Sequence, residues 1–209
     1  MPTNDSTLPP DLEERLLRAG FLAEGDVSFI IDSLHADLPR QRVLALRAAN
    51  RRGLLTHEYW LRALKDPAVD VRREALAALA YVENVERELL VVVRAMLEDR
   101  DALVVDGAIF TLGEHLDVDA VARLAEIAHD HADARCRESA VAALGAIGDD
   151  RGRAAVLAAL DDKPPVRRRA IVALSNFEGP DVDAALAMAA QDRDWQVRAA
   201  VDQLNKEPD

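Results

Sequence analysis

The sequence predicts an all-α fold, a right-handed α-α superhelix of about six stacked helix pairs. Apolar residues recur at helical spacing along most of the 209-residue chain. A segment with this spacing returns about every thirty residues, which is typical of a solenoid. Hydrophobic residues make up 50% of the chain but aromatic residues only 4%, a composition that suits closely stacked helices rich in alanine and leucine.

The repeating unit is clearest in residues 135–161. Its first helix places five residues on one face: Cys136, Ala140, Ala143, Leu144 and Ile147. The turn Gly148-Asp149-Asp150 then ends this helix and offers an N-cap to a second helix with its own apolar stripe. Two helices this short cannot bury their apolar faces alone, so the unit requires neighbours of the same shape.

Five copies of the unit align on the first buried position of the first helix. These positions are separated by 33, 32, 30 and 31 residues, and they are Val71, Val104, Cys136, Val166 and Val197. Four positions later the residues are mostly small, as close helix contact requires: Ala75, Ala108, Ala140, Ala170 and Val201. We expect Cys136 to be a small buried hydrophobic residue.

Acidic residues recur at one position of the repeat and basic residues at another. We call these two sets the acidic column and the basic column. Five positions before the first buried position of the first helix lie Asp66, Asp99, Asp161 and Asp192, with His131 as the exception. One position after it lie Arg72, Arg137, Arg167 and Arg198, with Val105 as the exception. An acidic residue before a helix satisfies its free N–H groups and favours the positive end of the helix dipole. The two columns also offer ion pairs between neighbouring repeats.

The motif D-x-x-x-x-V-R, followed by Ala and Ala-Leu at helical spacing and then by Gly or an acidic turn, resembles HEAT repeats. It is closest to the short variety found in phycobilisome-lyase-like HEAT proteins. The resemblance covers about residues 38–206. It implies the fold and says little about function, because this fold hosts many unrelated roles.

The chain reads as one domain behind a short tail. Residues 1–10 are polar and end in prolines, which predicts disorder, and residues 11–209 form a single repeat domain. Residues 11–37 fit the repeat pattern poorly, so we expect them to form two helices that cap the N-terminal end of the solenoid. The first should extend through Arg18 and be ended by Gly20, and the second should run from Asp26 to Leu34. The repeats fill residues 38–206, with further helices expected at 39–50, 57–65, 85–97, 118–128, 151–160, 182–190 and 195–204.

The charge of the chain is uneven. The net charge is −12, from 38 acidic and 26 basic residues. Residues 66–130 contain fifteen acids and six bases, whereas residues 1–65 contain nine of each. A strongly acidic centre attracts a basic segment of a partner and repels nucleic acid.

The sequence also indicates the cellular compartment in which the protein is expected. A single cysteine excludes an intramolecular disulfide. No apolar run approaches the ~18–20 residues needed to span a bilayer, and the N-terminus lacks the features of a signal peptide. We therefore expect a cytoplasmic protein that does not bind membranes.

No catalytic residue, metal site or cofactor site is predicted. Deoxyhypusine hydroxylases are HEAT-repeat enzymes that bind two irons through His-Glu pairs, but here the only such dipeptide, His57-Glu58, lies in a second helix without a mate. Glu114-His115 has the reverse order, and His129 and His131 suit the C-terminal end of a helix dipole. No G-x-S-x-G, P-loop or G-x-G-x-x-G motif occurs. The sequence therefore predicts a protein that is not an enzyme.

Two alternatives stand beside protein binding. The first is a phycobilin-lyase-like, tetrapyrrole-handling protein, because the repeats resemble those of phycobilin lyases. No set of residues in the sequence marks a bilin site. HEAT-like glycosylases cradle DNA in a basic concave face, whereas this chain is acidic and its densest basic cluster is Arg167-Arg168-Arg169. Nucleic-acid binding is therefore the less favoured alternative.

The favoured prediction is a non-enzymatic scaffold or adaptor that binds a basic or helical segment of another protein on the concave face of the solenoid. The second helices of HEAT pairs usually line that face, and an aromatic residue in a pre-helix turn offers an anchor. The candidate binding residues are Tyr59, Arg62, Arg87, Val91, Arg94, Asp119, Arg123, Glu126 and Trp195. An open end of the solenoid also offers a surface for a homodimer.

Overall fold

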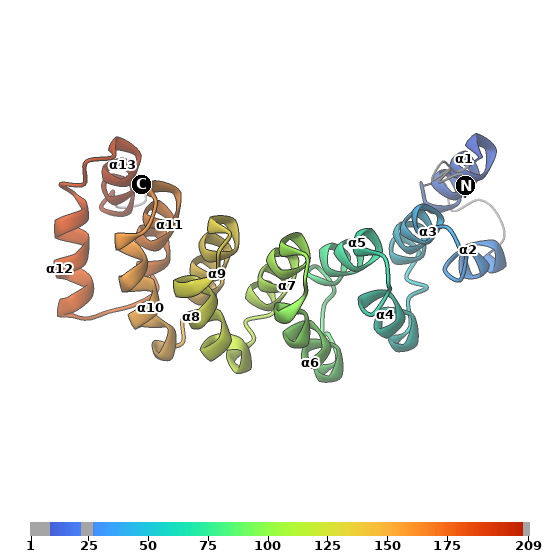
Figure 1. Ribbon diagram of the computed structural model, residues 1–209, viewed down its shortest axis with the longest axis horizontal. Helices are drawn as coiled ribbons and strands as arrows, with labels where there is room; N and C mark the ends of the chain where they lie inside the picture. Colours follow the sequence, from blue (N-terminus) through green and yellow to red (C-terminus); the bar gives the residue numbers. More distant parts are fainter. Residues whose placement is uncertain (1–8, 22–26, 207–209) are drawn as a thin grey trace. The chain divides into compact units, whose positions relative to one another are not determined.

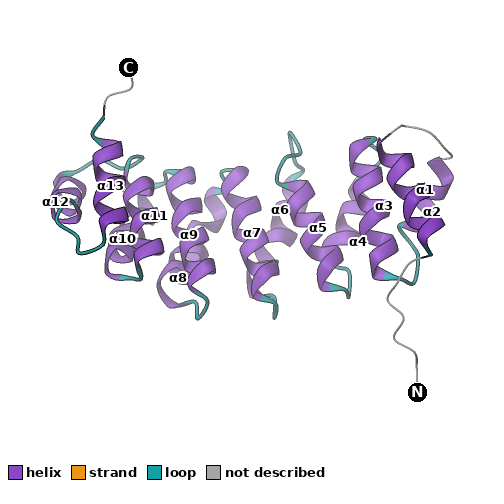
Figure 2. Cartoon of the chain, turned by 90° about the horizontal axis from the view of Figure 1, so that it is seen from above, coloured by secondary structure: helices purple, strands orange, loops and turns teal. Residues whose placement is uncertain are grey.

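The computed structural model describes residues 9–21 and 27–206, and every regular element in these ranges is a helix (Figures 1 and 2). The helices form two compact units, residues 1–93 and 94–209. In the described chain the α-helices make six successive pairs and a final helix, as the sequence predicts. That residues 11–209 form a single repeat domain stays a prediction.

The first unit consists of a row of first helices with second helices alongside it. Its helices are α1 (Pro10–Phe21), α2 (Val27–Ser33), α3 (Pro39–Arg51), α4 (His57–Leu64), α5 (Val69–Leu79) and α6 (Arg87–Ala95), the last of which runs into the second unit. Helix α3 packs against both α1 and α5, while α2 packs against α3 and α4 against α5 (Figure 1).

The second unit repeats this arrangement. Its elements are the short 3-10 helix η1 (Met96–Glu98), α7 (Ala102–Glu114), η2 (Val118–Ala120), α8 (Val121–Asp130), α9 (Ala134–Ile147), η3 (Asp150–Gly152), α10 (Arg153–Ala158), η4 (Ala159–Asp161), α11 (Pro164–Leu174), α12 (Pro180–Ala189) and α13 (Trp195–Leu204). Helices α7, α9, α11 and α13 pack in sequence, and α8, α10 and α12 lie alongside them. Stacked helix pairs of this kind confirm the predicted α-α superhelical fold class.

The buried columns agree with the sequence register. All five register positions and all five residues four positions later are buried. Cys136 is fully buried, and its thiol donates a hydrogen bond to the carbonyl oxygen of Ala102 at 3.3 Å. Burial raises the pKa of this thiol to about 11, so Cys136 is a packing residue and not a reactive thiolate.

The N-terminal boundary differs from the prediction. Helix α1 begins at Pro10, so the predicted disordered tail overlaps the helix by one residue, and residues 1–8 and Asp26 lie outside the described part of the chain. The sequence also predicts that Gly20 ends this helix, whereas α1 continues to Phe21. A Cβ atom on Gly20 would lie 3.0 Å from the Cα atom of Ala48 on α3, so the glycine allows close helix packing instead of ending a helix.

The same glycine–alanine contact recurs between first helices of the second unit. Gly113 on α7 faces Ala143 on α9, and Gly145 on α9 faces Ala173 on α11. A Cβ atom on Gly145 would lie 2.6 Å from the Cβ atom and 2.7 Å from the Cα atom of Ala173. These glycines therefore determine how closely neighbouring pairs approach.

An arginine on the first helix joins two consecutive turns between pairs. In the first unit, Nε and Nη2 of Arg42 each donate to a carboxylate oxygen of Asp66 at 2.7 Å. The remaining nitrogen, Nη1, donates to the carbonyl oxygens of Ala36 and Asp37, both at 2.8 Å. The two side chains are only 12% and 6% exposed. One guanidinium thus binds the turn before its own helix and the turn before the next first helix.

The second unit contains two further bridges of this kind. Arg137 binds Asp162 at 2.6 and 2.8 Å, and Arg167 binds Asp192 at 2.9 and 2.8 Å. Each arginine also donates to a carbonyl oxygen of the turn before its own helix, that of His131 or of Asp162. The predicted pairing of the Asp and Arg columns is therefore confirmed for Arg167 with Asp192, whereas Arg137 binds the residue after the column position, Asp162.

Two details of the acidic column differ from the prediction. The bridging residue before α11 is Asp162 and not Asp161, because Asp161 is the last residue of η4 and only the following residue lies in the turn. The column residues also do not cap helices. The capping carboxylates lie two positions later, and they belong to Asp101, Asp133 and Asp194. A column aspartate instead accepts from the N–H two residues on, as Asp66 does from Ala68 at 2.8 Å.

The bridges lower the pKa of their carboxylates. The side-chain hydrogen bond from Arg137 holds the pKa of Asp162 below its usual value, and that from Arg167 does the same for Asp192. A carboxyl group with a depressed pKa in the folded state stabilises that state above its unfolded pKa of about 3.9. This contribution is lost as the pH falls through the folded-state pKa.

We predict that Gly145→Ala destabilises the second unit by about 1–3 kcal/mol, because the new methyl group overlaps Ala173. Urea unfolding followed by circular dichroism measures the change. Ala146→Ser, an exposed change on the next residue of the same helix, should shift the free energy of unfolding by less than about 0.5 kcal/mol. Equal effects of the two changes would contradict the close-approach explanation.

We also predict that acid weakens the fold less in Asp192→Asn than in the natural protein. The variant is less stable at pH 7 because it lacks the charged bridge, but it has no carboxyl group to protonate there when the pH falls to about 3. Urea unfolding at both pH values gives the comparison. Asp183→Asn, at an exposed aspartate of α12, serves as the control and should keep the natural pH dependence. An unchanged acid loss in Asp192→Asn would refute the assignment.

Candidate functional site

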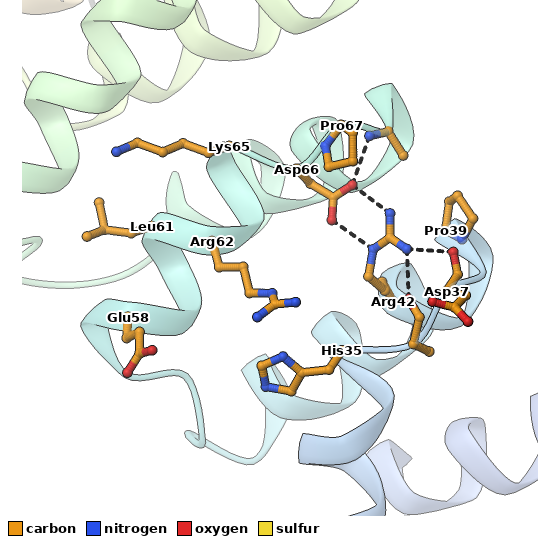
Figure 3. Close-up of a pocket in the computed structure, with 12 residues that line it drawn as sticks. His35, Asp37, Pro39, Arg42, Glu58, Leu61, Arg62, Lys65, Asp66 and Pro67 are labelled. Carbon is orange, nitrogen blue, oxygen red and sulfur yellow. Dashed lines mark hydrogen bonds and ion pairs between the residues drawn. The ribbon is translucent and has the colours of Figure 1, made fainter.

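A groove of about 870 Å³ opens in the first unit (Figure 3). One wall is the exposed side of α4, with Glu58, Leu61, Arg62 and Lys65. The other walls are the turns before α3 and before α5, residues 35–39 and 66–68, together with Arg42. The groove therefore lies where two consecutive turns of the repeat face each other.

The Arg42–Asp66 bridge fixes the two turns that border the groove. Its donors and acceptors are committed to the fold, because the guanidinium binds Asp66 and two carbonyl oxygens while the carboxylate also accepts from the Ala68 N–H. Buried bidentate pairs of this kind hold a specific geometry. The bridge gives the groove rigid walls and leaves its own charges neutralised.

Arg62 projects into the groove from α4. Figure 3 shows its guanidinium directed into the space between His35 and Arg42. In the described part of the chain it makes no hydrogen bond or ion pair, and the residue is exposed. Tyr59, one turn earlier on α4, packs edge-on against His35 with ring centroids 6.0 Å apart and an interplanar angle of 62°. Arg62 and His35 thus line two different walls of the groove, and the His35 ring is held by its contact with Tyr59.

The predicted binding residues do not all lie in one place. Arg62 lines the groove, and both Tyr59 and Arg62 line a small cavity that shares Arg42 and Asp66 with it. Arg87 and Val91 lie on the exposed side of α6, and Val91 is 52% exposed. Trp195, the first residue of α13, is 66% exposed.

The predicted residues of α8 and its surroundings are engaged in ion pairs of the second unit. Arg94 binds Asp117 at 2.5 Å and Asp119 at 3.5 Å, and Asp117 is buried. Arg123 binds Glu98 and Glu126, both at 2.6 Å. The hydrogen bonds to Glu126 and Glu98 raise the pKa of Arg123. These contacts give Arg94 and Arg123 a structural role, while their role in partner binding stays a prediction.

Sequence reasoning missed His35, Lys65 and the Arg42–Asp66 bridge as parts of one site. Arg42 precedes Asp66 by 24 residues, almost the separation of 25 found in the two bridges of the second unit, so the basic column could have been extended by one repeat. No sequence signal marks His35, which falls in the turn after the predicted cap helices.

Within residues 9–21 and 27–206, no three His, Cys, Asp or Glu side chains gather where they could hold a metal ion. No helix among these residues is both long enough and apolar enough to cross a membrane.

Comparison with known proteins identifies the repeat. The family model for HEAT repeats matches residues 58–145 and 121–205, which together span most of the chain. No curated protein sequence matches the chain. The phycobilisome-lyase-like variety of the repeat, inferred from the sequence motif, stays a prediction.

Several solved structures share the fold at low sequence identity. A designed armadillo repeat protein in complex with the peptide (KR)4 aligns with a TM-score of 0.65 and 15% identity, over 86% of this chain and 98% of the design. Designed armadillo repeat proteins for modular peptide recognition align with a TM-score of 0.62 and 15% identity, over 86% and 98%. YibA from Escherichia coli aligns with a TM-score of 0.63 and 16% identity, over 93% and 74%. These similarities support the repeat-solenoid fold.

Proposed function

The chain belongs to the HEAT-repeat family, and we propose that it is a non-enzymatic scaffold that binds a segment of another protein. The groove of the first unit carries this proposal. It is large enough for several side chains, rigid walls border it, and its polar wall includes a cation that the fold does not use. A site of this kind suits an extended or helical segment laid across the repeat.

The structural relatives support the same class of function. One is a designed repeat protein in complex with a peptide, and others were designed for modular peptide recognition. We infer from this shared architecture that the stacked helix pairs here also present a binding surface. The proposed partner is therefore a protein segment and not a small-molecule substrate.

Further exposed residues on the second helices and at the C-terminal helix extend the proposed surface. Val91 and Trp195 are exposed apolar residues, and tryptophan is a frequent anchor in protein interfaces. The acidic excess of residues 66–130 favours a basic partner segment in that part of the chain. The concave face, a homodimer through a solenoid end and the cytoplasmic location stay predictions from the sequence.

We predict that a photo-cross-linking amino acid in the groove captures a defined partner in the native host. Glu58 is exposed and borders the groove, so its replacement by benzoylphenylalanine places the reactive group there without disturbing the core. Ala77, an exposed residue of α5 outside the groove, provides the matched position. We expect a discrete adduct from position 58 after irradiation and none from position 77, detected by a mass shift on a denaturing gel.

Two outcomes would count against the scaffold proposal. The first is no adduct from position 58 under conditions in which the variant is folded and expressed. The second is the same pattern of adducts from positions 58 and 77, since this would indicate random collisions and not a seated partner.

A further inference from the structure

We propose that the groove of the first unit recognises an acidic segment of its partner, by binding a carboxylate of that segment to Arg62. This inference rests on the proposed scaffold function and adds the chemistry of the partner at this groove. It is carried by the contrast between two arginines in the same groove, Arg42 and Arg62.

Arg42 cannot serve the partner, because all of its guanidinium nitrogens are bound within the fold. Nε and Nη2 are 2.7 Å from the Asp66 carboxylate, and Nη1 is 2.8 Å from two carbonyl oxygens. The guanidinium group of Arg62 also has five N–H donors and, like every guanidinium, accepts no hydrogen bond. Since no acceptor in the described part of the chain binds it, its donors are available to a ligand in the groove.

The fold itself does not require a cation at this position. Arg62 lies four residues before the bridging aspartate, Asp66. At the equivalent positions in the two bridges of the second unit lie Ala158, before Asp162, and Met188, before Asp192. Both of those bridges form with a neutral side chain there. The bridge therefore does not require a cation at position 62, and the Arg62 guanidinium is available to an anion.

The surroundings of Arg62 favour a carboxylate. A planar guanidinium matches a carboxylate in a bidentate pair. His35 borders the same space and offers a ring nitrogen, while its ring is held against Tyr59. The acidic side chain of Glu58 points away from the Arg62 guanidinium in Figure 3, and Asp66 is neutralised by Arg42. Asp37 and Lys65 also line the groove and carry opposite charges, so the positive charge that favours a carboxylate is the local one at the Arg62 guanidinium.

The charge distribution along the chain supports the same partner. Residues 1–65 contain nine acids and nine bases, so an acidic segment meets no net repulsion there. Residues 66–130 carry fifteen acids and six bases and would repel the same segment. Repulsion of this kind restricts where a partner can bind, which contributes to specificity.

The test is a binding measurement on the full chain with labelled peptides of known composition. The probes are an octapeptide of alternating Glu and Leu, its isosteric Gln version and an octapeptide of alternating Lys and Leu, followed by fluorescence anisotropy. The variants are Arg62→Gln and Arg62→Met, the second of which introduces the residue found at position 188. Arg168→Gln, at an exposed arginine of α11, is the matched control.

We expect the Glu peptide to bind the natural chain and Arg168→Gln equally. Both Arg62 variants should bind it at least about tenfold more weakly, because charge-assisted hydrogen bonds are lost. The Gln peptide should bind the natural chain as weakly as the Glu peptide binds the Arg62 variants. Unchanged unfolding midpoints of the variants, expected from the exposure of Arg62, show that the loss is local.

Other results overturn the inference in ways that can be told apart. Equal binding of the Glu peptide by Arg62→Gln and the natural chain shows that Arg62 does not bind the carboxylate. Equal binding of the Glu and Gln peptides, or preference for the Lys peptide, rejects an acidic partner. If no peptide binds but position 58 still gives a specific cross-linked adduct, the acidic segment is rejected and the scaffold proposal stands. If no peptide binds and position 58 gives no adduct, the scaffold proposal is rejected as well.

Discussion

The bridge between an arginine of one first helix and the aspartate of the next turn is the interaction on which the repeat depends. Each short helix pair buries too little surface to be stable alone, so the pairs must be held in a fixed register. The arginine does this by binding backbone carbonyls of its own turn and a carboxylate of the following turn. Where the arginine is replaced by the buried Val105, the following turn has His131 in place of the aspartate, so no buried charge is left without its partner.

The same bridge explains how a groove arises between two turns of the first unit. It draws two turns to a fixed separation, and the exposed end of the second helix between them then borders a rigid groove. Residues at that end are free to vary, because the bridge does not contact them: the position occupied by Arg62 in the first unit is Ala158 or Met188 in the second. Function can therefore change at one position of one repeat while the stacked pairs are maintained, as is general for solenoids.

The sequence predicts the periodic part of this structure well and the groove poorly. Helix α13 has the predicted bounds, and the register positions are buried, since both follow from apolar spacing. Gly20 is misread as a helix end because spacing does not reveal that α3 lies against it. Asp161 is placed in the bridge instead of Asp162 because a fixed count of five cannot detect that the turn before α11 is one residue shorter: Asp162 lies four residues before Val166, whereas Asp192 lies five before Val197. The ion pairs of Arg94 with Asp117 and of Arg123 with Glu98 join residues 23 and 25 positions apart in the chain, so helical spacing does not reveal them.

The most direct test of the central role of the bridge is a double-mutant cycle on Arg167 and Asp192, measured by urea unfolding at pH 7. The side chains of Arg167 and Asp192 are 6% and 16% exposed, so Arg167→Met or Asp192→Leu alone leaves a largely buried charge without its partner and should cost about 3–5 kcal/mol. The double variant removes both charges and should be more stable than the sum of the two losses implies, by more than about 1 kcal/mol. Losses that simply add, within about 0.5 kcal/mol, would show that the two side chains stabilise the repeat independently and would contradict the account.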